Sequence, residues 1–258
     1  MKKTLNKKSI TFLAILLSVL ISFGCTKKKE TVVERKGTIN SMAGDVIIKK
    51  DDKSQPAKVG DFVVSGTTIE TGAKSFVAIY FGENIIRLSE NTALSIDKLE
   101  TAANSEQTEL NLEMGEVFSK VVKKLVKGDS YQIKTPTTVA AIRGTEFGVL
   151  ERDGKSKISC LSGKVKVANI TLQKDKEDLE FVEVSSNEEV QVISNQPLEV
   201  TALSEEDRKR MENIFSNIGA ANVDIEEKIE DTKPQIRKAP AKPKPVNTQK
   251  SIDQKDEL

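Results

Sequence analysis

Few side chains in this sequence are suited to catalysis. The chain of 258 residues contains no histidine, so it lacks the side chain that most often transfers protons near neutral pH and the commonest zinc ligand. Two cysteines are too few for a metal site made of cysteine alone. Ser95 and Lys98 have the Ser-x-x-Lys spacing of a lysine-activated nucleophile, but a chain rich in both residues produces this spacing by chance. We therefore predict no enzyme activity, no metal and no cofactor, with a hydrolase using Ser95 and Lys98 as an alternative.

A thiol follows an apolar stretch near the start of the chain. Residues 1–8 are basic and polar, residues 9–24 are almost wholly apolar, and Cys25 comes next. This order is typical of a secretory signal, because about 15 apolar residues fall short of the roughly 20 that cross a bilayer. Gly24 and Cys25 resemble the lipobox of bacterial lipoproteins, with Ser22 in place of the usual leucine, as in spirochaete-type lipoproteins. The resemblance implies loss of residues 1–24 and lipidation of Cys25 by a diacylglycerol thioether and a further fatty acid such as palmitate.

This segment predicts where the protein lies. Two or three acyl chains on Cys25 would anchor it firmly to a membrane of the bacterial cell envelope, on the periplasmic face or at the surface, with residues 25–36 as a tether. Removing four lysines with the signal lowers the net charge of +1 to −3. A nucleic-acid partner, which needs a concentrated basic face, is therefore not expected. An ordinary signal peptide and an uncleaved membrane anchor are the alternatives.

The middle of the chain has the pattern of β structure. Residues 37–202 contain short runs rich in valine, isoleucine, phenylalanine and threonine, separated by turns that contain glycine. This pattern predicts an all-β sandwich or roll of short strands. The run 77–81 is continuously apolar, which indicates a strand covered on both faces. Cys160 lies in an alternating stretch and is expected to be buried as a small apolar side chain.

The β domain shows signs of an internal duplication. A Gly-charged-Val triplet recurs at residues 44–46, 115–117 and 163–165. Residues 69–72 and 133–136 also resemble each other, and hairpin-like pairs follow at 76–88 and 146–161. We therefore expect two similar β units that share one core.

Three further segments complete this domain. Residues 109–114 alternate and predict a strand, whereas residues 116–126 are compatible with a strand or a short helix. Residues 180–184 and 189–193 flank a polar turn, which predicts one more hairpin that extends the sheet.

Several motifs between residues 70 and 167 resemble the FecR domain family. They are Thr71 to Ile79 with Ile86-Arg87-Leu88, Leu110 to Phe118, Tyr131 to Pro136, Arg143 to Val149, and Ile158 to Val167. The best-known members are membrane-bound regulators of iron-responsive sigma factors, whose FecR domain lies in the periplasm and receives a signal from an outer-membrane transducer. The resemblance implies an envelope β module. No cytoplasmic helical segment precedes the apolar stretch here, so we do not expect sigma-factor control.

The signature residues 143–147 have a structural interpretation. Gly144 permits a tight bend, Thr145 can bond the bend locally, and Phe147 returns the chain to the core. Arg143 could pair with Glu146 or bind free carbonyl groups. The functional alternative is that Arg143 contacts a ligand together with Arg87 on the echoed hairpin, because arginine is scarce here, at seven residues against 33 lysines.

The last part of the chain predicts one helix and a polar tail. Ser204 and the acids after it form a helix start over residues 203–219, with Met211, Ile214, Phe215 and Ile218 as one apolar stripe and Gly219 as the end. We expect this helix to pack on the β domain, and a partner-binding or self-associating helix is the alternative. Residues 220–258 are rich in proline, lysine and glutamate and predict disorder, as a spacer or as a contact with anionic envelope polymer.

Two short motifs indicate a different compartment. Residues 255–258 spell an endoplasmic-reticulum retention signal, and residues 169–171 spell an N-glycosylation site. A eukaryotic lumenal protein is therefore an alternative, which the lipobox-like and FecR-like motifs outweigh.

We predict a lipid-anchored, non-catalytic binding or scaffold module, with envelope proteins or anionic envelope polymer as partners. The alternative function is a component of envelope signal relay that resembles FecR regulators.

Overall fold

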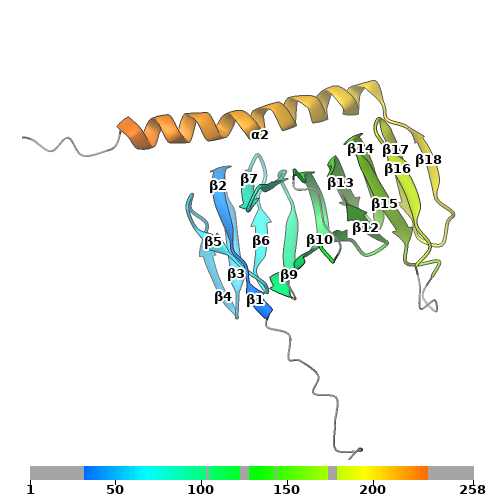
Figure 1. Ribbon diagram of the computed structural model, residues 1–258, viewed down its shortest axis with the longest axis horizontal. Coiled ribbons are helices and arrows are strands. Elements are labelled where there is room, and N and C mark those ends of the chain that lie inside the picture. The colour runs from blue at the N-terminus through cyan, green and yellow to red at the C-terminus, as the bar shows by residue number, and fades with distance from the viewer. Residues whose placement is uncertain (1–31, 103–104, 123–127, 143, 174–178, 232–258) are drawn as a thin grey trace, which may run out of the picture.

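The computed structural model describes residues 32–102, 105–122, 128–142, 144–173 and 179–231, with side chains described as far as Ile218. The chain forms strands from Val32 to Ala202, and one helix, α2 (Glu205–Asp231), follows them. Figure 1 shows the strands side by side in a long row, with α2 running along one side of the row. The predicted all-β fold with a C-terminal helix is confirmed.

Two sheets share the long strand β10 (Ser105–Lys120), whose first part belongs to sheet A and whose last part belongs to sheet B. Sheet A has the order β4 (Lys53–Pro56), β3 (Val46–Lys50), β6 (Thr68–Thr71), β9 (Ala93–Ala102), β10, β11 (Ser130–Lys134), β12 (Thr138–Ile142), β15 (Lys164–Asn169) and β16 (Val182–Ser185). β1 (Val32–Glu34) pairs with the end of β9. Neighbours are antiparallel except β10 and β11, which are parallel.

Sheet B is antiparallel throughout. Its order is β5 (Phe62–Val63), β2 (Gly37–Ala43), β7 (Phe76–Phe81), β8 (Asn84–Leu88), β10, β13 (Glu146–Arg152), β14 (Lys155–Ser162), β17 (Glu188–Ile193) and β18 (Glu199–Ala202). The two sheets bury one continuous core, to which sheet A contributes residues such as Ile69, Leu94 and Ile133, and sheet B residues such as Ile79, Ile86 and Phe147. This core holds both sheets in place by the burial of apolar surface.

The three Gly-charged-Val triplets mark the places where the chain passes between the sheets. Gly44 lies between β2 and β3, Gly163 lies between β14 and β15, and Gly115 lies inside β10 where its pairing changes. All three glycines have a positive φ. A Cβ atom on Gly163 would lie 2.6 Å from the carbonyl oxygen of Gly144, so the corner needs glycine for both backbone freedom and space.

The strand pairing shows the expected duplication. The hairpin β7–β8 lies between β2 and β10, and the hairpin β13–β14 lies in the same way between β10 and β17. In sheet A, β6 pairs with β9 as β12 pairs with β15. The predicted match of residues 69–72 with 133–136 is therefore wrong by one strand, because the counterpart of β6 is β12 rather than β11.

Two other features differ from the sequence prediction, and one alternative that the sequence left open is decided. Residues 180–193 form two strands but no hairpin, because β16 pairs with β15 in sheet A and β17 pairs with β14 in sheet B. Residues 32–34 of the predicted tether form β1. Residues 116–120 belong to a strand, which decides between the strand and the short helix as far as the end of β10.

Helix α2 begins with a capping hydrogen bond, since the backbone N–H of Asp207 donates to Oγ of Ser204 at 3.1 Å. Met211, Phe215 and Ile218 pack on Ile85 and Phe118 of the outer face of sheet B, which confirms the predicted apolar stripe and its packing. The prediction that Gly219 ends the helix is wrong, because α2 continues to Asp231. A glycine inside a helix costs only about 1 kcal/mol, and the sequence after it is rich in alanine and glutamate. The predicted tail beyond residue 231 lies outside the described residues.

Candidate functional site

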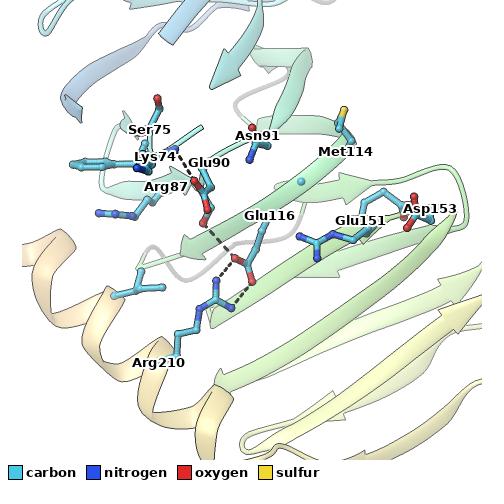
Figure 2. A pocket seen from close by; sticks show the side chains of 15 residues that line it. Lys74, Ser75, Arg87, Glu90, Asn91, Met114, Glu116, Glu151, Asp153 and Arg210 are labelled. Carbon is cyan, nitrogen blue, oxygen red and sulfur yellow. Dashed lines mark hydrogen bonds and ion pairs between the residues drawn. The ribbon is translucent and has the colours of Figure 1, made fainter. Parts of the chain in front are cut away.

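A groove of about 750 Å³ lies where the outer face of sheet B meets α2 (Figure 2). Its walls come from the turn before β7, the end of β8, the glycine bend of β10, the turn between β13 and β14, and α2. It is lined by Lys74, Ser75, Phe76, Arg87, Ser89, Glu90, Asn91, Met114, Gly115, Glu116, Glu151, Arg152, Asp153, Arg210 and Ile214. The groove thus brings together side chains that are far apart in the sequence.

Arg87, a predicted ligand contact, lies in this groove on β8. Its guanidinium carbon is 3.9 Å from the centre of the Phe76 ring, which fixes the plane of the cation. The Nε atom is buried and has no hydrogen-bond partner among the described residues, and burial lowers the pKa of Arg87. An arginine in this position gains little from bonds within the described fold and keeps its terminal N–H groups for an acceptor.

Glu116 is the carboxylate at the centre of the groove. Arg210 of α2 binds both of its oxygen atoms, with 2.8 Å between Nη1 and Oε1, and Ser89 donates to Oε2 at 3.3 Å. The hydrogen bond to Glu116 raises the pKa of Arg210. The guanidinium carbon of Arg210 also lies 5.3 Å from the centre of the Phe118 ring. This bidentate pair joins the helix to the groove wall.

Glu151 borders the groove and belongs to a buried hydroxyl network. Ser156 donates to its Oε2 at 2.5 Å, and the hydroxyl groups of Thr135 and Thr137 lie 2.6 Å and 2.7 Å from the same serine. Oγ1 of Thr135 also accepts the backbone N–H groups of Thr137 and Thr138. Thr135 of the Thr-Pro element therefore links the end of β11 to the β13–β14 hairpin through hydrogen bonds and has a structural role.

The remaining signature residues mostly have the predicted structural role. Gly144 has a φ of 66°, and Phe147 is fully buried in the core. The predicted local bond of Thr145 is wrong, because its hydroxyl donates to the Lys164 carbonyl of β15 at 3.0 Å. Arg143 lies outside the described residues, so its contact with a ligand beside Arg87 stays a prediction. Glu146, its predicted partner, pairs with Lys120 at 2.7 Å.

The side chains of the alternative hydrolase hypothesis, and the free thiol of Cys160, are poorly placed for reaction. Lys98 is bound to Glu109 at 2.8 Å, and this bond raises its pKa, whereas a lysine that activates serine needs a lowered pKa. Ser95 points its hydroxyl at Asp97, 3.3 Å away. Cys160 is a free, fully buried thiol on β14, as expected, and burial together with the charge of Glu188 raises its pKa to about 12.

The asparagine of the glycosylation motif is buried and makes hydrogen bonds within the fold. Asn169 is 1% exposed, and its amide nitrogen donates to the carbonyl groups of Ile193 and Gln196. A side chain in this position cannot receive a glycan without local unfolding. The retention-like tetrapeptide and Cys25 lie outside the described residues.

Within the ranges that the structure covers, no three histidine, cysteine, aspartate or glutamate side chains gather as metal ligands. In the same ranges, no helix has the length and apolar character that a membrane crossing requires.

Sequence reasoning identified Arg87 but missed its neighbours. Arg210 and Glu116 are separated by 94 residues, so no local pattern connects them. The scarcity of arginine was the available signal, and it marked Arg210 as clearly as Arg87. Phe76 was expected only as part of a strand, because its stacking on Arg87 depends on the pairing of β7 with β8.

Two solved structures and one family model are similar to parts of this chain. Two crystal structures of a "putative anti-sigma factor" from Parabacteroides distasonis ATCC 8503 are similar to this chain, each with 16% sequence identity and a TM-score of 0.41. The similarity covers 54% of this chain and 61% of the other, so this chain spans less than two thirds of that protein. No curated protein matches the chain. The family model described as FecR protein matches residues 67–166, which run from just before β6 into β15.

Proposed function

We propose that this chain is a lipid-anchored, non-catalytic binding module of the bacterial cell envelope, and that the groove around Arg87 is its ligand site. The observation that carries the proposal is a cavity of about 750 Å³ containing a stacked guanidinium whose Nε has no acceptor among the described residues. Ligand sites commonly have volumes of about 300–1,000 Å³ and place a few polar groups among apolar walls.

The side chains around the groove support binding rather than chemistry. Glu116 is engaged by Arg210, and Glu151 is engaged by Ser156, so these two carboxylates have hydrogen-bond partners within the fold. Ser95 and Lys98, the predicted nucleophile and base, do not line the groove. The groove is suited to holding a ligand through arginine while the fold stays unchanged.

The lipid anchor follows from the sequence order of a basic start, an apolar stretch and Cys25. Each buried CH₂ of an acyl chain contributes about 0.8 kcal/mol, so two or three chains would hold the domain at a membrane. Confinement to the membrane would raise its effective concentration near membrane partners, which favours a module of modest affinity.

Intact mass of the protein extracted from membranes tests the anchor. We expect a mass equal to residues 25–258 plus acyl groups, and we expect Cys25→Ala to lose both the acyl mass and the membrane association. Cys160→Ala is the matched control, because it removes the other sulfur from a buried position. Retention of residues 1–24 on the membrane-bound protein would refute the anchor.

A role in signal relay is the second candidate, and the FecR domain at residues 67–166 favours it. A relay needs a partner that carries the message across the membrane. A photo-crosslinking amino acid at the exposed Met114 on the groove rim would identify what the groove meets in cells. Crosslinks to a membrane-spanning protein that depend on Arg87 would support relay, whereas crosslinks only to structural envelope proteins would count against it.

A further inference from the structure

Arg87 and Glu116 are neighbours on the outer face of sheet B. Arg87 of β8 lies opposite Phe118 of β10, so Glu116, two residues earlier, is its diagonal cross-strand neighbour. Diagonal neighbours are separated by about 7–8 Å, which two long side chains of opposite charge can span. In this structure they do not pair. The Glu116 carboxylate points toward Arg210 (Figure 2). The Arg87 side chain lies against Phe76.

The docked position of helix α2 therefore determines whether Glu116 binds Arg210 or is left to other partners. With α2 docked, Arg210 takes both carboxylate oxygens of Glu116. Without α2, Glu116 would keep only Ser89 as a side-chain donor. Its two diagonal cross-strand neighbours with a guanidinium, Arg87 of β8 and Arg152 of β13, both line the groove and would then be within its reach. A carboxylate of the protein itself would then compete for the position that a ligand would use.

Resting on the proposed function, we infer that the groove binds the carboxylate group of a small acidic ligand on Arg87, and that docking of α2 enables this binding because Arg210 removes Glu116 as a competitor. Stacking on Phe76 leaves the edge of the guanidinium free for a bidentate contact of the kind that Arg210 makes with Glu116. A single guanidinium matches the single charge of a carboxylate.

The overall charge of the groove does not itself attract anions. Its lining contains four cationic and four acidic side chains. Binding must therefore depend on short-range contact at Arg87 rather than on the field of the groove, and its dependence on salt should be weak. Coupling between two sites is reciprocal, so the ligand should also stabilise the docked helix.

Calorimetric titration of the full chain in detergent tests the inference, with a dipeptide of two glutamates blocked at both ends as the probe. We expect a Kd on the order of 1 mM, no binding of the corresponding dipeptide of two glutamines, and at least about tenfold weaker binding by Arg87→Gln. No binding by the native chain, or equal binding by Arg87→Gln, would overturn the proposal. Inorganic phosphate that binds more tightly than the dipeptide would overturn the choice of a carboxylate.

Two variants of the Arg210 pair test the role of α2. Arg210→Gln should weaken binding about tenfold, and the double variant Arg210→Gln, Glu116→Gln should restore it, because the competing carboxylate is then gone. Arg208→Gln removes an equal charge from the same helix, where it binds Glu205 and Glu212 outside the groove, and should bind normally. A double variant as weak as Arg210→Gln would mean that Arg210 binds the ligand directly and would overturn the coupling. None of these results depends on the mass of the lipidated chain, so the proposed anchor is tested separately.

Discussion

Replacing Phe215 with alanine should detach α2 from sheet B while both sheets stay folded. Phe215 is 5% exposed, and its ring meets the Phe118 ring edge to face, with 6.1 Å between the centroids. A buried Phe→Ala change costs about 3–5 kcal/mol, and we expect about 3 kcal/mol because this site lies at the margin of the molecule. The remaining ion pairs of the helix each contribute only about 0.2–1 kcal/mol. An isolated helix is marginal in water, so the loss should appear as local opening.

Amide hydrogen exchange followed by mass spectrometry measures this effect. Because 1.36 kcal/mol corresponds to a factor of ten, residues 208–218 should exchange roughly a hundredfold faster in Phe215→Ala, while peptides from β8 and β13 should be unchanged. Phe62→Ala is the matched control, because Phe62 is 63% exposed on β5 and does not belong to the apolar cluster that packs against α2. Equal acceleration in helix and core would refute the reasoning, since it would make α2 part of one cooperative unit with the sheets.

Three further predictions concern buried and paired groups. Ser156→Ala removes the hydroxyl that donates to Glu151 and should lower the free energy of unfolding by about 2 kcal/mol, and a loss below about 0.5 kcal/mol in urea titrations would contradict the network. Cys160, with its pKa raised to about 12, should resist iodoacetamide at about pH 8 in the native protein and react in urea, whereas rapid native labelling would disprove its burial. The hydrogen bond from Lys157 lowers the pKa of Asp207, so its stabilising effect should be present above about pH 4 and disappear as the pH falls through the lowered pKa. Urea titrations between about pH 3 and pH 7 should therefore show the difference between the native chain and Asp207→Asn shrinking with acid, and a constant difference would contradict the assignment.

The strands were predictable where local sequence determines them. The hairpins at residues 76–88 and 146–161 combine β-branched runs with turn residues, and both were found at the expected places. The hairpin predicted at residues 180–193 was wrong because nearness in sequence does not specify the sheet in which a strand finds its partner. Gly219 was misleading for a related reason, since a glycine can end a helix or continue it at a modest cost.

The groove was only partly predictable. Arg87 was selected because arginine is scarce and because its hairpin appeared to be repeated. Its stacking on Phe76 and its distance from Arg210 depend on strand register and on the position at which α2 crosses sheet B. These are tertiary properties, and no spacing of residue types in the chain encodes them locally.

The place of the groove follows from the duplication. Arg87 belongs to the hairpin of the first unit, Glu116 to the strand that opens the second, and residues 151–153 to the turn of the second hairpin. The groove therefore lies at the junction between two similar units. The two units contribute different strands to this junction, so the two walls of the groove are not alike. After β17 the described residues contain only β18 and α2, so a third unit is absent from them. They therefore contain one junction between units, and α2 crosses it. A duplicated fold can in this way produce a single site, and α2, which follows both units in the chain, is placed to contact both walls at once.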